Sequence, residues 1–354
     1  MSMENVFGQR LQQARTMQGW SLRELAAATG GKVSHTALAR YERGEMSPGS
    51  EILVAVAQAL QQPADFFFRP FTVKLGKISY RKRAALKGKK IEAAIEQATD
   101  FFERYREAEE LSGEIVAFDP PFPKAKPLAS AEEADVYADH LRTKWHLGTD
   151  PIPSVMNLME RKGIKICELE LDPKLDGFSA EADGAPLVVL AQTANKPRKR
   201  MTCVHEAAHV LLPMPPEEKL EEDIAYRFAG AFLLPREIFA YEFGKHRNRI
   251  GLSELMELKD TFGVSMMGIM KRAEQLKMIS AETYLHFCKY ANKEGWRQKG
   301  EPDDGRCTCD ETPMRFRQLV RRAVAEERIT LSKGASLLKQ DLHSFRKELQ
   351  GLIV

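Results

Sequence analysis

The chain has 354 residues, of which 43% are hydrophobic and 29% charged, and its formal net charge is +3. This length and apolar content allow two or three domains with buried cores. No run of about 18 apolar residues occurs, which excludes a membrane-spanning helix, and the N-terminal sequence shows no export signal. The five cysteines are scattered, as expected for reduced thiols. We therefore expect a cytoplasmic protein.

The charge is unevenly distributed along the chain. Residues 1–90 carry 15 Lys and Arg against 6 Asp and Glu, whereas the rest of the chain has an acidic excess. A basic N-terminal part on an acidic body predicts a polyanionic partner at one end only. A solvated basic face without a partner is the alternative interpretation of the same charges.

Residues 6–68 show the pattern of four short helices separated by turns. The second helix begins at Ser21 with Glu24 three residues later, which is the spacing of a capping box, and Gly30 ends it. The third helix ends at Gly44, and the fourth is strongly apolar. The pattern predicts a small helical bundle.

The second and third of these helices have the layout of a helix-turn-helix in the stretch SLRELAAATGGKVSHTALARYERG. Such a unit needs a recognition helix whose first residues reach the edges of DNA bases. We expect Ser34, His35, Thr36 and Arg40 on its exposed face, where Arg suits guanine and Ser and Thr suit phosphates or bases. Lys32 in the turn suits a phosphate. A bundle used only for dimerisation or protein contacts is the alternative.

The middle of the chain contains a connector, a long helix and two strands. Residues 71–90 are basic, residues 91–111 read as an amphipathic helix, and residues 119–127 are rich in proline, which marks a boundary. Residues 164–171 and 185–192 have the composition of strands. Further helices follow, so we expect a mostly α fold with a small β-sheet, of the α+β class.

The last part of the chain divides into a polar stretch and a helical tail. We expect residues 297–312 to be a mobile linker and interpret Cys307 and Cys309 there as free thiols, because a lone C-x-C is a weak metal signal. Residues 313–350 predict two or three short helices. They faintly resemble a second helix-turn-helix, and a docking or dimerisation tail is equally compatible with the pattern.

The segment RMTCVHEAAHVLLP, which starts at Arg200, places two histidines four residues apart. On a helix His205 and His209 share one face and can offer nitrogens to one ion. Zinc favours such ligands, and a carboxylate beside the open position, here Glu206, can take a proton from bound water. Asn195 is a plausible helix start. Two histidines on an ordinary surface helix are the alternative.

A third ligand is expected from the segment EEKLEEDIAYRFAGAFLLP. Glu222 shares a helical stripe with Ala225 and Ala229, so its carboxylate can face the histidine helix across small residues. A His-His-Glu set is a known combination for catalytic zinc. Because the register is open by one residue, Glu221 is the alternative ligand.

These two segments resemble the ImmA/IrrE family of zinc metallopeptidases. That family shows R-F-T-x-x-H-E-x-x-H and, further on, E-x-x-A-[ND]-x-F-A-x-x-L-L-M-P. The resemblance covers about residues 130–300 and implies a zincin-like peptidase fold. It also implies a Zn²⁺ site with His205, His209 and Glu222 as ligands and Glu206 as catalytic base.

Two departures from that pattern stand out: Met201 replaces Phe, and Tyr226 stands where the family often has Asn or Asp. The helix-turn-helix stretch resembles the XRE, lambda-repressor-like family, S-x-x-x-L-A-x-x-x-G-x-S-x-x-x-I-x-x-x-E-R-G. Its turn, GGKVS, is two residues longer than in that pattern.

The two resemblances together imply a recurring two-part protein found among bacterial and phage-related regulators, some of them in toxin–antitoxin or stress-response operons. We expect four parts along the chain. They are an XRE-type DNA-binding domain over 1–70, a connector with a long helix over 71–129, an ImmA/IrrE-type peptidase domain over 130–296, and a linker with a helical tail over 297–354.

Our leading hypothesis is a DNA-binding transcriptional regulator whose zinc domain cleaves a repressor or itself. Its expected partners are a double-stranded operator, a protein substrate and a second copy of the chain, on the nucleoid of a bacterial cytoplasm. The alternative is a repressor or antitoxin-like protein whose zinc domain is a non-catalytic sensor or partner-binding module. Glu206 favours the first, because a binding scaffold has no need of a general base. A constitutive degradative peptidase fits poorly with a DNA-binding module.

Overall fold

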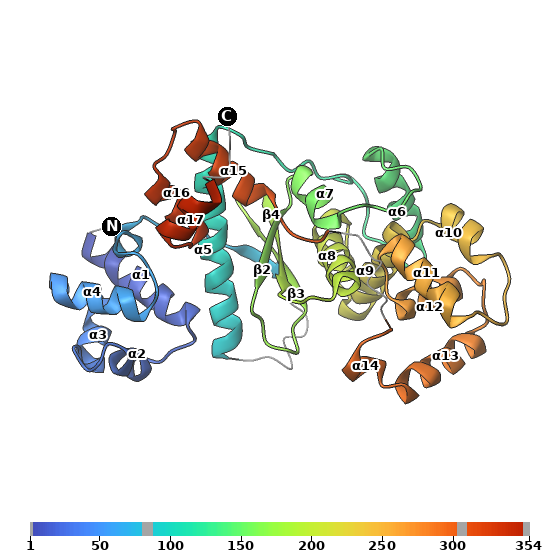
Figure 1. Ribbon diagram of the computed structural model, residues 1–354, viewed down its shortest axis with the longest axis horizontal. Helices are drawn as coiled ribbons and strands as arrows, with labels where there is room; N and C mark the ends of the chain where they lie inside the picture. Colours follow the sequence, from blue (N-terminus) through green and yellow to red (C-terminus); the bar gives the residue numbers. More distant parts are fainter. Residues whose placement is uncertain (1–2, 80–87, 303–309, 350–354) are drawn as a thin grey trace.

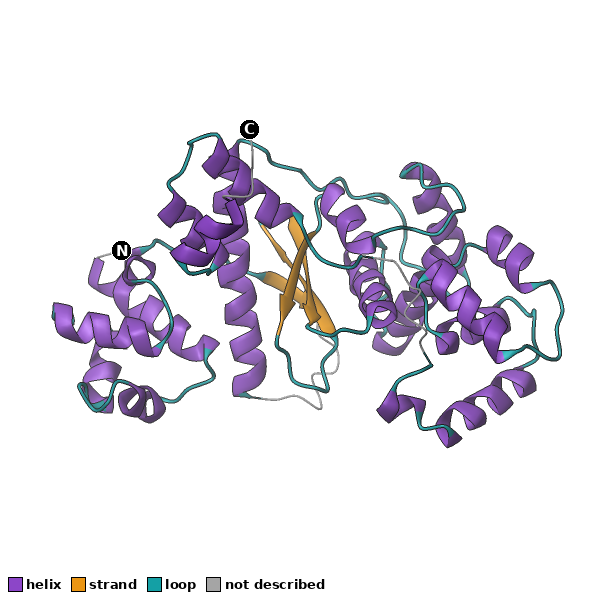
Figure 2. Cartoon of the chain, viewed as in Figure 1, coloured by secondary structure: helices purple, strands orange, loops and turns teal. Residues whose placement is uncertain are grey.

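The structure is a computed structural model that describes residues 3–79, 88–302 and 310–349 (Figure 1). Most of these residues are helical, and four strands form one sheet, which confirms the mostly α fold with a small sheet (Figure 2). The N-terminal helices lie at one end, a long helix stands beside the sheet, and the C-terminal helices return to that long helix. No helix of the described part is long and apolar enough to span a bilayer.

The N-terminal unit is the predicted small helical bundle. The capping box forms as expected, since the Ser21 hydroxyl accepts from the Glu24 backbone N–H and the Glu24 carboxylate accepts from that of Ser21. Its core is built from apolar side chains of all four α-helices and of the 3-10 helix that follows them. The elements are α1 (Met3–Met17), α2 (Leu22–Ala28), α3 (His35–Glu42), α4 (Ser50–Ala59) and η1 (Ala64–Phe68).

The predicted long helix is α5 (Lys89–Ser112), and it is packed on several sides. On the side facing α1, Glu103 of α5 lies 2.7 Å from Arg10 of α1, which is 1% exposed. Towards the sheet, Glu109 lies 2.6 Å from the buried Nζ of Lys165. The helix therefore joins the N-terminal bundle to the rest of the molecule as a packed element.

The sheet has the strand order β1-β3-β4-β2. The expected strands are present as β2 and β4, which pair in parallel, whereas β1 and β3 were not predicted. β3 pairs antiparallel with both β4 and β1, and the β3–β4 hairpin turns at Asp183 and Gly184, both with positive φ. This Asp-Gly pair is a typical hairpin signal. The bounds are β1 (Gly76–Ser79), β2 (Lys165–Leu169), β3 (Gly177–Ala182) and β4 (Ala185–Ala191).

The largest hydrophobic core lies between the sheet and the helices that follow it. Within this part α9 is packed between α6 and α8, which are its main helical neighbours. The helices are α6 (Glu133–Lys144), α7 (Val155–Arg161), α8 (Lys196–Leu211), α9 (Glu218–Leu233), α10 (Arg236–Phe243), α11 (Leu252–Phe262), α12 (Met266–Gln275), α13 (Ala281–Lys293) and α14 (Trp296–Lys299).

The C-terminal tail forms α15 (Arg315–Ala325), α16 (Leu331–Leu338) and α17 (Leu342–Leu349). These helices share a core with α5, in which Tyr105 stacks on Phe316. The tail is therefore docked on its own chain, as one of the two alternatives for it predicts.

The prediction of a mobile linker over 297–312 is wrong for the part of it that the structure describes. The Glu301 carboxylate accepts hydrogen bonds from two backbone N–H groups at the start of α12, at 2.8 and 3.0 Å. The Glu311 side chain is fully buried, lies 2.5 Å from Arg200 and accepts from the first two N–H groups of α7. Helix N-termini attract carboxylates, which is why a polar stretch is pinned here. Cys307 and Cys309 lie outside the described residues.

Candidate metal centre

The histidine motif lies on α8, and its first turn forms as the sequence predicts. The Asn195 side chain caps the helix by accepting from the Arg198 backbone N–H at 3.0 Å, and Pro197 follows in the first turn. His205 and His209 lie on the same face one turn later, with ring centroids 5.2 Å apart.

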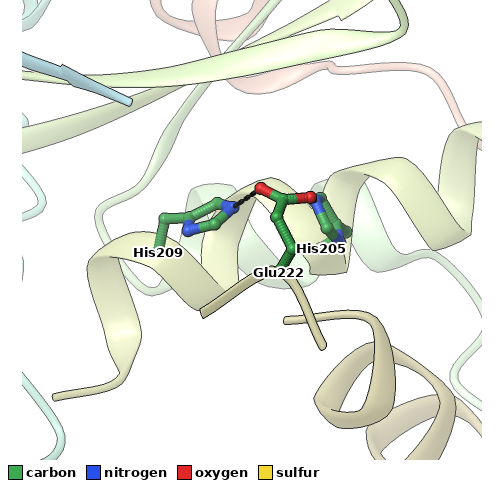
Figure 3. Close-up of side chains that lie close together, drawn as sticks. All are labelled: His205, His209 and Glu222. Carbon is green, nitrogen blue, oxygen red and sulfur yellow. Dashed lines mark ion pairs between the residues drawn. The ribbon is translucent and has the colours of Figure 1, made fainter. Parts of the chain in front are cut away.

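Glu222 on α9 reaches across to both histidines. One of its carboxylate oxygens lies 3.6 Å from Nε2 of His205, and the other lies 3.7 Å from Nε2 of His209 (Figure 3). Two ligands about 2.0–2.2 Å from one tetrahedral ion stand roughly 3.4 Å apart. One potential ligand atom from each of the three residues lies within 4.8 Å of the others. The donor set and its spacing therefore fit zinc.

Glu221, the alternative ligand, takes a different position. Its side chain is buried, and its Oε1 lies 2.8 Å from Nδ1 of His209, on the far side of the ring from Glu222. A carboxylate that holds the second ring nitrogen of a histidine fixes the tautomer and the direction of the ring. The two neighbouring glutamates thus contact opposite nitrogens of one imidazole.

Glu206 is almost buried and lines the same cleft as the three potential ligands. It lies against the start of β3, where Gly177 leaves room for it. A Cβ at Gly177 would stand 3.3 Å from Cγ of Glu206 and 2.6 Å from the carbonyl oxygen of Val189. Sequence analysis missed this glycine, because its role depends on the contact between β3 and α8.

The cleft has a volume of about 1010 Å³ and is open to the surface. This is at the upper end of the range for ligand pockets. Ala207 and Ala208, between the two histidines, are fully buried in the core. Besides the motif residues, the walls include Asp176, Asn195, Arg198, Lys259, Trp296 and Glu301.

Tyr226 is a second residue at this site that the sequence did not single out as functional. Its ring centroid lies 4.1 Å from that of His205, and its side chain is half exposed in the cleft. Burial, together with the nearby Glu222 and Asp176, raises the pKa of Tyr226. In the sequence, the replacement of the usual Asn or Asp by Tyr226 was the one sign that this position differs from the family pattern.

The four expected DNA-contacting residues lie on or next to α3. Ser34, His35, Thr36 and Arg40 are all exposed, as predicted. The Ser34 hydroxyl caps α3 by accepting a backbone N–H at 3.1 Å, and Arg40 lies 3.5 Å from Glu45. The start of α3 therefore lies at the surface, with its cap formed by its own residues.

The basic charge assigned to this module lies mainly outside its helices. Residues 1–70 contain seven Lys and Arg against six Asp and Glu, whereas residues 71–90 contain eight basic residues and no acidic one. Lys89, at the start of α5, lies 3.6 Å from Glu24 of α2. The connector therefore ends beside the helix-turn-helix.

Comparison with protein families matches two parts of the chain. The helix-turn-helix model matches residues 11–67, and the model of the IrrE N-terminal-like domain matches residues 159–274. The chain is a fusion of a helix-turn-helix domain and an IrrE N-terminal-like domain. Both resemblances seen in the motifs are thereby confirmed. No curated protein and no solved structure shows a significant match.

The helix-turn-helix domain and the IrrE-like domain together identify a DNA-binding regulator that carries a metallopeptidase-type domain. The IrrE-like match is shorter than the stretch of about 130–300 that the motifs implied. All four residues of the candidate metal centre fall inside it, whereas Glu301 and Glu311 lie beyond its end.

Proposed function

We propose that the protein is a transcriptional regulator whose IrrE-like domain is a zinc-dependent endopeptidase that cleaves a repressor or its own chain. The observation that carries this proposal is the convergence of His205, His209 and Glu222 in a cleft that Glu206 also lines. A sensor domain would need the three ligands and would have no use for Glu206. The protein would act on operator DNA in a bacterial cytoplasm.

The chemistry follows from what each side chain can do. His205, His209 and Glu222 would hold zinc, which supplies Lewis acidity and lowers the pKa of water at its open position. The Glu206 carboxylate would accept a proton from water in the cleft and deliver it to the amine of the departing peptide. Glu221 keeps the Nε2 of His209 directed towards Glu222 by holding Nδ1.

The DNA-binding part of the proposal rests on α3. We propose that Ser34, His35, Thr36 and Arg40 contact an operator, and that the chain binds it as a homodimer, because helix-turn-helix domains commonly read two half-sites. A cut that changes operator occupancy would then couple the two domains. The proposed segments for self-cleavage are 71–90, of which 80–87 lie outside the described residues, and the mostly exposed loop 119–127.

The deciding experiment compares the parent with Glu206→Gln. We expect the variant to retain one zinc per chain and to lose cleavage of co-encoded proteins and of its own chain. His205→Ala should lose the zinc as well. Metal analysis and immunoblots of both proteins measure these outcomes. Equal cleavage by the parent and by Glu206→Gln would exclude Glu206 as general base. If neither protein cleaves its own chain or any co-encoded protein, the result favours the sensor.

A further inference from the structure

The contact between Tyr226 and His205 has a consequence for the metal site. We propose that Tyr226 is a positioning residue, whose ring holds the His205 imidazole in the orientation that faces Glu222. This inference rests on the proposed zinc site and adds to it a residue outside the ligand set and the general base.

The position of Tyr226 follows from the way in which α8 and α9 pack. Glu221 contacts His209, whereas Tyr226, further along α9, contacts His205, one turn earlier on α8. Glu222 lies between them and approaches both histidines. The two helices therefore run antiparallel at this point. Residues four apart share a helix face, so α9 presents a ligand and an aromatic ring side by side.

The two histidines are supported by different kinds of contact. His209 is supported by the Glu221 carboxylate, 2.8 Å from its Nδ1. His205 has the Tyr226 ring against it, with 4.1 Å between centroids and an angle of 43° between the planes. An aromatic ring this close to an imidazole hinders rotation of that imidazole, because close-packed side chains leave little free volume. A ligand that is fixed before binding loses less conformational entropy when a metal arrives.

The exposure of Tyr226 is unusual for a residue that only fills space. Its side chain is 50% exposed, whereas Ala225 and Ala229 on the same helix are fully buried. Together with Met201 it lines both the metal cleft and a second hollow of about 710 Å³. The ring thus forms a wall beside His205 and limits the access of water from that side. An Asn or Asp at this position could not provide such a surface.

Zinc affinity tests this role without any knowledge of the substrate. The full-length protein is titrated with zinc against a chromophoric chelator, for the parent, Tyr226→Phe, Tyr226→Ala and Tyr241→Ala. Tyr241 is 82% exposed on α10 and serves as the matched control. We expect Tyr226→Ala to weaken zinc binding about 10–100-fold, which is the usual effect of removing an outer support. Tyr226→Phe keeps the ring and should stay within about twofold of the parent, and Tyr241→Ala should be unchanged.

A second measurement separates positioning from stability. The absorption spectrum of the Co²⁺-substituted protein reports ligand geometry, and thermal unfolding of the metal-free protein reports packing. An altered Co²⁺ spectrum for Tyr226→Ala, with the parent spectrum retained in Tyr226→Phe, supports the proposal. Zinc affinity unchanged in Tyr226→Ala would overturn it, even if the unfolding temperature fell. Equal losses for Phe and Ala would assign the effect to the hydroxyl and also overturn it. A parent that binds no zinc would instead refute the zinc site itself.

Discussion

Adjacent glutamates on α9 show how one residue step separates two roles. Glu222 points both oxygens towards the Nε2 atoms of the two histidines, whereas Glu221 is buried against Nδ1 of His209. Helical periodicity places Glu222 on the stripe of small residues. It does not exclude Glu221 as the ligand, because the rotation of the helix about its axis depends on packing. The sequence was therefore sufficient to name the two carboxylates that approach the histidines. Which of them faces the Nε2 atoms and which contacts Nδ1 is decided by the packing of α9 on α8.

Arg40 and Lys32 test the DNA interface at the level of single side chains. Arg40 must exchange its 3.5 Å contact with Glu45 for a base edge, so Arg40→Ala should cost about 1–3 kcal/mol of operator binding and relax the sequence preference. Lys32 is exposed and suits a phosphate, so Lys32→Ala should lower the binding affinity for all DNA sequences alike. Binding isotherms on operator and scrambled DNA over a salt series measure both effects. An operator affinity that ignores salt would contradict this interface.

Glu160 gives a prediction of pH dependence. This carboxylate is 3% exposed at the end of α7 and accepts from the Met314 and Arg315 backbone N–H groups at 2.9 and 3.0 Å. Burial raises its pKa from 4.5 to about 7. Below pH 4.5 both the folded and unfolded chains are protonated there. As the pH rises to 7 the unfolded chain ionises more readily, so the carboxylate destabilises the folded state increasingly.

We therefore expect Glu160→Gln to be more stable than the parent at pH 8, by roughly 3 kcal/mol. The amide oxygen still accepts from both N–H groups of the α15 start, so the capping contact is retained. The difference between the two proteins should shrink as the pH falls towards 4.5. Urea unfolding at pH 5 and pH 8 measures it, and a variant less stable than the parent at pH 8 would contradict the raised pKa.

At the level of elements, the sequence predicted what depends on neighbours in the chain. Helix α8 begins at its Asn195 cap, and α5 follows its amphipathic pattern, because caps and periodicity are local. β3 was missed because its sequence, GFSAEA, is made mostly of small and polar residues, although the Asp-Gly turn after it is a hairpin signal. The polar stretch before α15 was misjudged for another reason: Glu311 finds its counter-charge, Arg200, more than a hundred residues away.

The Glu311–Arg200 pair joins the segment just before the C-terminal tail to the helix that carries the metal motif. Both side chains are at most 1% exposed. Removing one partner of a buried ion pair leaves the other uncompensated and costs about 3–5 kcal/mol. We expect Glu311→Gln to lower the free energy of unfolding by about 3 kcal/mol or more. Asp310→Asn, at the exposed neighbouring position, should change it little.

Chemical unfolding of the full chain followed by tryptophan fluorescence measures this difference. Equal stability of Glu311→Gln and the parent would show that this ion pair does not stabilise the fold. The family match ends at residue 274. A chain cut there would leave Arg200 buried without its carboxylate, so the stable unit of this protein extends beyond the recognised domain.

At the level of the whole molecule, α5 holds three parts together through charged contacts. Arg10 of the DNA-binding unit pairs with Glu103, and Lys165 of the sheet pairs with Glu109. The tail is held by Lys339, which lies 2.8 Å from the buried Asp100 of α5. A cut in the loop 119–127, after α5, would therefore leave the two halves joined by the Lys165–Glu109 and Lys339–Asp100 contacts and by the β1–β3 pairing. Self-cleavage at this loop alone does not predict release of the DNA-binding domain.

A protease site engineered into 119–127 tests this consequence. After cleavage we expect the two fragments to elute together in gel filtration and to separate only in denaturant. The Lys165–Glu109 and Lys339–Asp100 ion pairs and the β1–β3 pairing hold them together without the loop. Fragments that separate in native buffer would show that the contacts around α5 are too weak to hold the halves.

The same argument determines what operator release in cells should look like. If the halves stay joined, a cut in the chain that frees the operator must lie between the DNA-binding unit and α5, in residues 71–88, and the Arg10–Glu103 contact must also open. The other possibility is a cut in a separate repressor bound beside the protein. Release should then be accompanied by loss of the full-length chain or of that repressor, and Glu206→Gln should block it. Immunoblots of both proteins before and after the inducing signal measure this outcome. Release that proceeds equally in Glu206→Gln with every protein intact would mean that ligand binding alone moves the helices around α5, and the IrrE-like domain would then act as a sensor.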